Sequence, residues 1–456
     1  MRQMATRGQT LVLSLLCTVT ASACTPPRPT HVLDARGRRT PSGPIKHVVV
    51  VTVDGLVPDS YLHPDAHGLK VPTLRRLVAD GAYSEGALST FPSVTYPAHT
   101  SIATGVNPGR HGIVSNRSFD PLELNREAWF WYAEDLKVKP LWQVAHDVGY
   151  RTALINWPVT VGARANWLWT EIWRAKHPED LKLIHALSTP GLARRVEHSF
   201  PGHAQRAVPP DNTDESGVDI AARVFQEGAP TLLFLHIHQV DGSQHKHGLW
   251  SEEAKAAIEG ADQQLGRLFK IVERAQLAAT TAFVIASDHG FADVTRQVNP
   301  GALLREAGLV ELDPNGKVLT WHASAVPSGG TTYLYVNESS PDAADRVSQL
   351  FERKASEAGS GIARVLKPAD IAALGGDPKA TLALEAELGV IFGSGYQTYE
   401  GTPLNRAAHG YSPQRPEMRA SLLVIGPTIK RGVVPDARLV DIAPTIASWL
   451  ALPLPE

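Results

Sequence analysis

The chain has 456 residues, of which 43% are hydrophobic and 20% are charged, and its formal net charge is -2. This composition is ordinary for a folded globular protein, and the small net charge argues against binding nucleic acid through bulk charge. No stretch after the amino-terminus is apolar and long enough to span a bilayer. The length suits one large α/β core with insertions.

The first residues have the pattern of an export signal. Arg2 and Arg7 precede an apolar run, and small residues end it just before Cys24. This order predicts a signal peptide over residues 1–23, and hence an exported protein at the periplasm or the outer cell surface. Cleavage there would leave Cys24 first, as in a bacterial lipoprotein whose lipid tethers it to the membrane. Ala21-Ser22-Ala23 also suits ordinary signal peptidase, so both outcomes stay open.

The cysteines limit the chemistry of the mature domain. Cys17 and Cys24 both lie in the leader region, so a disulfide or a thiolate ligand is not expected beyond it. Any metal must be held by histidine, aspartate and glutamate. Residues 24–44 are rich in proline, arginine, threonine and glycine, which predicts a flexible tether before a catalytic domain at 45–456.

Apolar runs that alternate with helical patterns predict the fold class. The run His47–Val53 has no polar alternation, which is typical of a strand covered on both faces. Similar runs are Thr152–Ile155, Thr231–Ile237, Thr281–Ala286 and Ser421–Ile425. Ser251 followed by two glutamates predicts the start of a long amphipathic helix. We therefore expect an α/β fold with a mostly parallel central sheet and helices on both faces.

A long insertion interrupts this pattern late in the chain. Residues 296–405 contain a strand pattern of their own at Thr332–Val336 and a helical pattern at Ala343–Ala355. We expect them to form a smaller cap subdomain that packs on the core.

Acidic residues follow three of the predicted strands. Asp54 ends the first, Asp241 follows the run 231–237, and Asp288-His289 follow the run 281–286. The carboxyl ends of parallel strands meet at one rim of the sheet, where ligands bind. Carboxylates buried together repel one another unless a cation lies among them. The pattern therefore predicts a metal site rather than a set of turn or helix caps.

Histidines complete the predicted ligand set. Asp241 and His245 are four residues apart, which places them on one face of a helical turn, and His409-Gly410 precede the last strand. Oxygen and imidazole ligands without thiolates suit zinc in a catalytic site. Two zinc ions about 3.5–4 Å apart can stabilise an in-line displacement at phosphorus. His236, His238 and His247 lie nearby as either supporting or ordinary structural residues.

A candidate nucleophile lies before a helix. Pro97 fits the first helical position, and the helix is expected to run to about Thr104 and to end at Gly105. Thr95 would then lie just before the helix amino-terminus, where free amides favour an alkoxide and a phosphate. The simpler alternative is that Thr95 or Ser93 only caps the helix.

These residues resemble a known family. The motifs that carry the resemblance are Asp54-Gly55, Thr95-Tyr96-Pro97-x-His99, His111-Gly112-Ile113-Val114-x-Asn116, Asp241-xxx-His245, Ser287-Asp288-His289-Gly290 and His409-Gly410. In this order they are similar to the nucleotide pyrophosphatase/phosphodiesterase branch of the alkaline phosphatase superfamily. The resemblance extends from about His47 to Leu450 and implies an alkaline-phosphatase-like core.

The resemblance also implies a role for each residue. One zinc would be bound by Asp241, His245 and His409, and the other by Asp54, Asp288 and His289. Thr95 would attack the phosphorus and give a phospho-threonine intermediate, while Asn116 and the Thr95 amide would hold a phosphate oxygen. The sulfatases of the superfamily need Cys or Ser at the nucleophile position, where this chain has Thr95.

The substrate side is less defined by the sequence. The family usually has Phe-Pro-Asn-His after the nucleophile, whereas this chain has Tyr96-Pro97-Ala98-His99, so its preference for nucleotides stays open. Tyr96 and Trp157 are candidates to stack on a base or aryl group, and the aromatic cluster around Trp129 is expected to be a small core under a loop.

The predicted function is zinc-dependent hydrolysis of phosphodiester or nucleotide pyrophosphate bonds. The alternative is a phosphomonoesterase or phosphonate hydrolase on the same two-zinc site. A monoesterase needs positive charge over the extra phosphate oxygens, and Arg117 and Lys246 are the nearest candidates for it. The expected ligand is a small phosphate ester, with nucleotides among the candidates. The sequence implies no protein partner.

Overall fold

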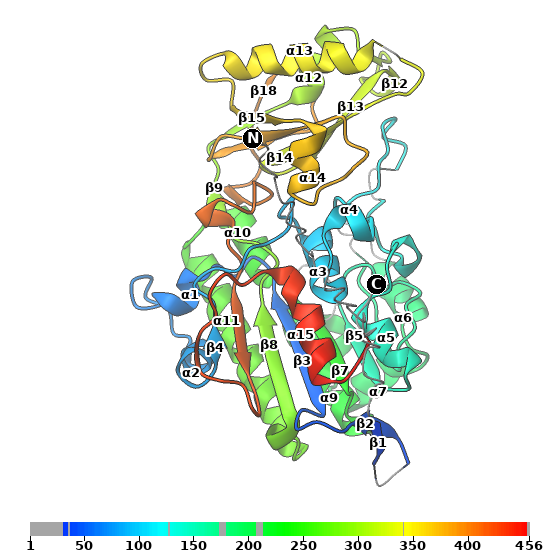
Figure 1. The fold of residues 1–456 in the computed structure, drawn as a ribbon, viewed down its shortest axis with the longest axis vertical. Coiled ribbons are helices and arrows are strands. Elements are labelled where there is room, and N and C mark those ends of the chain that lie inside the picture. Colours follow the sequence, from blue (N-terminus) through cyan, green and yellow to red (C-terminus); the bar gives the residue numbers. More distant parts are fainter. Residues whose placement is uncertain are drawn as a thin grey trace, which may run out of the picture.

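The computed structural model describes residues 31–34, 37–125, 128–172, 179–206, 213–340 and 342–453. An eight-stranded sheet in the order β21-β4-β20-β8-β3-β7-β5-β6 forms the centre of the molecule (Figure 1). Its strands are β3 (His47–Val53), β4 (Ala82–Tyr83), β5 (Thr152–Ile155), β6 (Trp167–Trp169), β7 (Leu232–Ile237), β8 (Thr281–Ala286), β20 (Leu422–Ile425) and β21 (Gly432–Val433). The predicted α/β fold with a mostly parallel sheet is confirmed.

The strands in the middle of the sheet are parallel and are covered on both faces. β3 pairs in parallel with β7 and β8, and β5 pairs in parallel with β7 and β6. All seven residues of β3 are buried, as a continuous β-branched run predicts. β20 is the exception, because it runs antiparallel to β8. The sequence predicted the strand but not its direction.

Helices cover both faces of the sheet. α2 (Pro72–Asp80), α9 (Thr213–Gly228) and α11 (Glu252–Arg274) pack on one face, and α3 (Thr95–Thr104), α5 (Leu141–Asp147) and α15 (Ile442–Trp449) pack on the other. Alternate valines of β3 contribute to the two cores, Val49 and Val51 to one, Val48 and Val50 to the other. Ser251 caps α11 by accepting a hydrogen bond from the Ala254 amide at 3.1 Å, as the sequence predicted.

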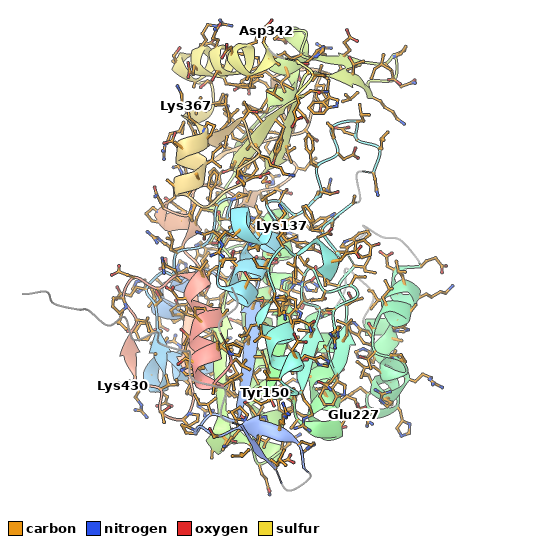
Figure 2. The ribbon with its side chains drawn as sticks, turned by 45° about the vertical axis from the view of Figure 1, so that its right-hand side comes forward. Lys137, Tyr150, Glu227, Asp342, Lys367 and Lys430 are labelled. Carbon is orange, nitrogen blue, oxygen red and sulfur yellow. The ribbon has the colours of Figure 1, made fainter. Side chains whose placement is uncertain are left out.

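The insertion has its own sheet and hydrophobic core. Within residues 296–405, β13 (Ala323–Ser328), β14 (Thr331–Val336), β16 (Leu382–Ala386) and β15 (Ile362–Leu366) form a four-stranded antiparallel sheet, and α13 (Ala343–Ser356) covers it. The other elements there are β10 (Arg296–Val298), α12 (Pro300–Glu306), β11 (Val310–Leu312), β12 (Val318–Trp321), α14 (Pro368–Ala373), β17 (Val390–Phe392) and β18 (Glu400–Gly401). This subdomain lies beyond one end of the central sheet (Figures 1 and 2). Its residues Asp342 and Lys367 are far from Tyr150 and Glu227 in the core (Figure 2).

The amino-terminal region differs in part from the predicted tether. β1 (His31–Leu33) and β2 (Arg39–Pro41) form a two-stranded antiparallel sheet, so the described part of residues 24–44 contains regular structure. The Arg39 guanidinium donates to the Val148 carbonyl at 3.0 Å and attaches this hairpin to the core. The predicted signal peptide and Cys24 lie outside the described residues. Within the described part of the chain, no helix is long and apolar enough to cross a membrane.

Candidate two-metal site and phosphate pocket

The predicted ligands meet at the carboxyl ends of the central strands. Asp54 directly follows β3, and Asp288 and His289 follow β8, its neighbour in the sheet. Asp241 and His245 lie in α10 (Gln239–His247), which begins after β7. His409 lies just after β19 (Ala407–Ala408), which pairs with β9 (Ala292–Asp293). Parallel strand order therefore collects ligands that are far apart in sequence.

One group of ligand atoms is deeply buried. Asp54, Asp288 and His289 each offer an atom, and these atoms lie within 4.8 Å of one another. His289 Nε2 is 3.3 Å from Asp54 Oδ1 and 3.1 Å from Asp288 Oδ2. We call this set the inner group.

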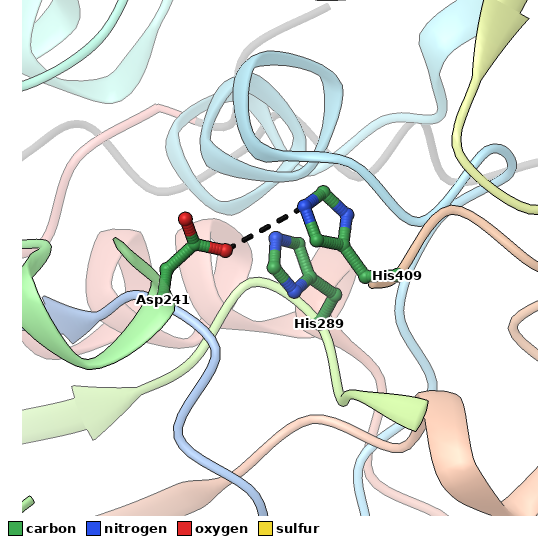
Figure 3. A group of neighbouring side chains, drawn as sticks. All are labelled: Asp241, His289 and His409. Carbon is green, nitrogen blue, oxygen red and sulfur yellow. Dashed lines mark ion pairs between the residues drawn. The ribbon is translucent and has the colours of Figure 1, made fainter. Parts of the chain in front are cut away.

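A second group lies beside the first and opens to solvent. Asp241, His289 and His409 offer ligand atoms within 4.8 Å of one another, and Figure 3 shows them facing a common centre. Asp241 Oδ1 is 3.5 Å from His409 Nε2 and 3.3 Å from His245 Nε2. Because His289 already belongs to the inner group, we call the other three residues, Asp241, His245 and His409, the outer group. His289 approaches both groups, although the family resemblance assigned it to one.

Main-chain hydrogen bonds orient the three histidines as ligands. The Nδ1 atoms of His245, His289 and His409 face the carbonyls of Ala407, Gly290 and Ser93 at 2.8, 3.1 and 3.0 Å. A neutral imidazole that donates from Nδ1 leaves a lone pair on Nε2. All three Nε2 atoms face the carboxylates, and each offers a lone pair to a metal once it carries no proton, which is how metal-binding histidines are held in proteins.

Buried polar atoms at the centre of the site fit a cation. Among the residues that the structure describes, Asp54 Oδ1, Asp241 Oδ1, Asp288 Oδ2 and His289 Nε2 are buried without a hydrogen-bond partner. Such atoms are costly unless something binds them. Burial raises the pKa of Asp54 well above its usual range, and the Asp288 and Asp241 carboxylates raise it further. Bound positive charge removes this repulsion, so the donor set fits metal ions at both groups.

The candidate nucleophile lies at a helix amino-terminus. α3 begins at Thr95, two residues before the predicted start at Pro97, and it ends at Gly105 as predicted. Val94 occupies the N-cap position, and the Ser93 hydroxyl donates to the Tyr411 carbonyl at 2.6 Å. Neither Ser93 nor Thr95 therefore acts as the N-cap. The partly exposed Thr95 faces the same cavity as Asp54 and Asp241.

Asn116 lies beside Thr95 as the motif implies. Its Oδ1 accepts a hydrogen bond from the Tyr96 amide at 2.9 Å. Because the carbonyl oxygen is occupied, the amide NH2 group is the part that can bind a ligand oxygen. His99 fixes the first turn of α3, because its Nδ1 bonds to the Thr95 carbonyl at 2.8 Å and its Nε2 to Thr52 Oγ1 at 2.8 Å.

The cavity has an aromatic wall. Thr95 and Asn116 line a cavity of 740 Å³. Its lining also includes Tyr96, Trp129, Glu171 and Lys246. The rings of Tyr96 and Trp129 are 5.2 Å apart in an edge-to-face arrangement. The aromatic cluster around Trp129, expected to be only a loop core, thus supplies a cavity residue. Trp129 lies beside Asn116 because its main chain pairs with that of Arg117 across the loop. Only this pairing, which the structure shows, indicates that Trp129 belongs to the cavity.

The prediction that Trp157 stacks on substrate is wrong. Trp157 is fully buried and packs edge-on against His99 at 4.9 Å and Phe234 at 4.7 Å. Asn156 has a positive φ of 51°, so the chain turns after β5 and the indole ring enters the core. Position at a strand end therefore did not suffice to place the side chain in the cavity.

Residues that the sequence did not single out support the ligands. The Asp214 carboxylate accepts hydrogen bonds from the amides of His238 and Gln239 at 2.9 and 3.3 Å, and so holds the start of α10. Glu171 was also missed, because no motif surrounds it. The three histidines left open, His236, His238 and His247, all contribute to the cavity lining. His236 bonds to Asp54 at 3.0 Å, and His247 also faces Glu253 at 3.7 Å.

Comparisons with known proteins identify the family of the chain. The family model "Type I phosphodiesterase / nucleotide pyrophosphatase" matches residues 48–412, a range that includes every candidate metal ligand from Asp54 to His409. The chain belongs to this family.

Curated relatives match over part of their length. The chain is 24% identical over 241 residues to human ectonucleotide pyrophosphatase/phosphodiesterase family member 1, covering 50% of this chain and 22% of that protein. It is 28% identical over 224 residues to ectonucleotide pyrophosphatase/phosphodiesterase 1 of Saccharomyces cerevisiae, covering 45% of this chain and 28% of that protein.

A solved structure has the same fold. Murine ectonucleotide pyrophosphatase/phosphodiesterase 5 is 19% identical, with a TM-score of 0.61, and the match covers 90% of this chain and 96% of that one. The expected alkaline-phosphatase-like architecture is therefore confirmed.

Proposed function

We propose that the protein hydrolyses phosphodiester or nucleotide pyrophosphate bonds with two zinc ions and the Thr95 hydroxyl as nucleophile. The observation that carries the proposal is the position of Thr95 and Asn116 in one cavity with Asp54 of the inner group and with the outer group. Zinc bound at the inner and outer groups would supply positive charge to the attacking and leaving oxygens and lower the pKa of the Thr95 hydroxyl.

The residues of the chain account for the remaining chemistry. Thr95 Oγ attacks phosphorus, a P–Oγ bond forms, and the bond to the leaving oxygen breaks with its electron pair on that oxygen. The proton lost by Thr95 is balanced by the one that the leaving group gains. Water then cleaves the phospho-threonine and restores the hydroxyl. Throughout, the Asn116 NH2 group and the amino-terminus of α3 hold the phosphate oxygens.

The cavity wall favours a diester over a monoester. Glu171 lies in the wall beside the Tyr96 hydroxyl, with 3.4 Å between the oxygens. A monoester carries an additional anionic oxygen, which a carboxylate repels, whereas the neutral substituent of a diester can pack on the partly exposed Trp129. The Tyr96 ring is fully buried behind it, so the prediction that Tyr96 stacks on substrate is not supported. The Arg117 guanidinium lies over the Trp129 ring at 5.5 Å.

One observation favours the second candidate, a phosphomonoesterase. Lys246 of α10 contributes to the cavity lining, and its charge would stabilise the extra oxygen of a monoester. The same lysine would also stabilise an anionic phosphate leaving group, as in a nucleotide pyrophosphate.

A neighbouring structure supports the choice of nucleophile and substrate class. One structure of murine ectonucleotide pyrophosphatase/phosphodiesterase 5 is described as an inactive threonine-to-alanine variant in complex with AMP. Thr95 is the threonine that we propose for the corresponding role, and a nucleotide is our first candidate substrate.

The test compares two substrates that differ only in the second ester. Zinc-loaded protein should hydrolyse bis-p-nitrophenyl phosphate with a higher kcat/KM than p-nitrophenyl phosphate. A preference for the monoester would assign the phosphatase function instead and make Lys246→Ala the next variant. Prolonged chelation should abolish the activity and added zinc should restore it. Activity that survives chelation would contradict the metal assignment.

We also propose that the protein acts outside the cytoplasm, on the pattern of residues 1–24. If Cys24 carries a lipid, the full chain should fractionate with membranes and its Cys24→Ala variant should be soluble. A soluble full chain would favour the ordinary signal peptide.

A further inference from the structure

A buried histidine connects the metal site to the substrate wall. His236 lies in β7 with 2% of its surface exposed. Its Nε2 is 3.0 Å from Asp54 Oδ2, and its Nδ1 is 3.0 Å from Glu171 Oε2. The two ring nitrogens therefore face two carboxylates, one in the inner metal group and one in the cavity wall.

The contacts continue from Glu171 to the aromatic wall. Glu171 follows β6, and its second oxygen, Oε1, accepts from the Tyr96 hydroxyl at 3.4 Å. Tyr96 is buried, and its amide donates to Asn116. One row of polar contacts thus runs from Tyr96 through Glu171 and His236 to Asp54, and the strands β6, β7 and β3 set its spacing.

This arrangement gives the two oxygens of Asp54 different environments. Oδ2 is held by His236, whereas Oδ1 has no hydrogen-bond partner among the described residues and lies 3.3 Å from His289 Nε2. Asp288 is divided in the same way, because its Oδ1 accepts from the Gly55 amide at 3.1 Å and its Oδ2 has no partner among those residues. Holding one oxygen presents the other to a metal in a fixed direction.

We propose that His236 and Glu171 are positioning residues that fix Asp54 as a ligand of the inner metal group and connect this ligand to the Tyr96 wall. The proposal rests on the two-metal site proposed above. His236 acts through Asp54, and Glu171 acts through His236 on one side and Tyr96 on the other. A displacement of the Tyr96 ring would therefore also change how Asp54 is held.

The main test removes the contacts of the histidine to Asp54 and Glu171, together with the contact of its Nδ1 to the Asn156 carbonyl at 3.2 Å. His236→Leu keeps a similar volume and should weaken binding of one of the two metals by about 10- to 100-fold, because loss of a partner that orients a ligand has effects of that size. The measurement is metal content and competition with a chromogenic chelator on the purified full chain. The cobalt-loaded variant should also change its visible absorption spectrum, because the inner ligand geometry changes.

Glu171 provides an independent variant and a rescue. Glu171→Leu should shift metal affinity and the cobalt spectrum in the same direction, and should also raise KM, since it borders the cavity. Glu171→Gln keeps an acceptor for His236 and should restore affinity toward that of the native protein. His47→Gln is the matched control, because His47 is a buried histidine at the opposite end of β3, bonded to the Pro230 carbonyl at 2.7 Å.

Two outcomes would overturn the proposal. Native metal affinity and an unchanged cobalt spectrum in His236→Leu would show that Asp54 needs no support from the histidine. If His236→Leu does not fold, Glu171→Leu decides, and native values in that variant have the same meaning. Failure of the proposed function is distinguishable, because it would appear as a lack of diester hydrolysis in the metal-loaded native protein.

Discussion

The inner and outer ligand groups differ in burial and in what holds them. The side chains of Asp54 and Asp288 in the inner group are 5% and 0% exposed, whereas those of Asp241 and His245 in the outer group are 19% and 24% exposed. The inner carboxylates follow adjacent strands of the central sheet, but the outer ligands lie on a helix and a late loop. The core sheet thus fixes the inner group, and other parts of the fold must complete the outer one.

The inserted subdomain supplies part of that support. Between β13 and β14, the Gly330 amide donates to the His409 carbonyl at 3.0 Å. A Cβ at Gly330 would overlap the Tyr411 ring, and Gly410 adopts a positive φ of 88° against Ser328. Only glycines allow the turn and the His409 loop to approach so closely. The subdomain therefore has its own hydrophobic core and also supports the main chain at His409, a candidate ligand of the outer group.

The largest effect on activity is expected at Thr95, which lies in the cavity with ligands of the inner and outer groups. Thr95→Ala should lower kcat by at least about 1,000-fold, since the proposed nucleophile is lost. Both metals should stay bound, because carboxylates and imidazoles hold them. Steady-state kinetics and metal content measure the two parts, with Thr95→Ser as the control that keeps a hydroxyl. Near-native turnover in Thr95→Ala would exclude this residue as nucleophile.

A change in the subdomain turn should affect metal binding at the outer group but not at the inner group. Gly330→Val would displace Tyr411 and His409, and we expect affinity for the outer metal to fall by about 10- to 100-fold while the inner metal is retained. Metal content after dialysis against a series of free-zinc concentrations measures this. Gly43→Ala, where a Cβ meets only ordinary contacts, is the control. Equal loss of both metals would show that the insertion does not act on the outer group alone.

Metal binding should depend on pH with a defined sign. Burial by itself would lower the pKa of His289, but the carboxylates of Asp288 and Asp54 raise it to about 9 in the metal-free protein. Below pH 9 this histidine carries a proton that a metal must displace. Apparent affinity should therefore rise with pH, by about tenfold per pH unit for each proton released, up to that pKa. Calorimetry in buffers of different ionisation enthalpy counts the protons, and a pH-independent affinity would contradict this.

The smallest effect is expected in the cavity wall. Trp129→Ala should raise KM for an aryl diester by about 5- to 10-fold, because one face of the aromatic wall is lost, with little change in metal content. Trp157→Phe should leave KM unchanged and instead lower Tm, since that ring lies in the core. Thermal unfolding and initial rates separate the two variants. The reverse pattern would restore Trp157 as the stacking residue.

The sequence by itself determined the fold class and pointed to the candidate metal ligands. Continuous apolar runs such as His47–Val53 and Thr281–Ala286 have the bounds of the observed strands, because a strand buried on both faces must be apolar throughout. Asp54, Asp288 and His289 could be predicted since they lie within three residues of the ends of such runs, and parallel strands bring their ends to one rim.

Only the tertiary structure decided how the side chains around these ligands are used. The roles that we propose for His236 and Glu171 depend on β6, β7 and β3 lying in the same sheet. No local sequence pattern predicts that order of strands. Trp157 was placed wrongly because a positive φ at Asn156 turns it inward, and Gly330 supports His409 across a long separation in sequence. Such contacts form between segments that are brought together by packing, whereas periodicity and motifs describe only neighbours along the chain.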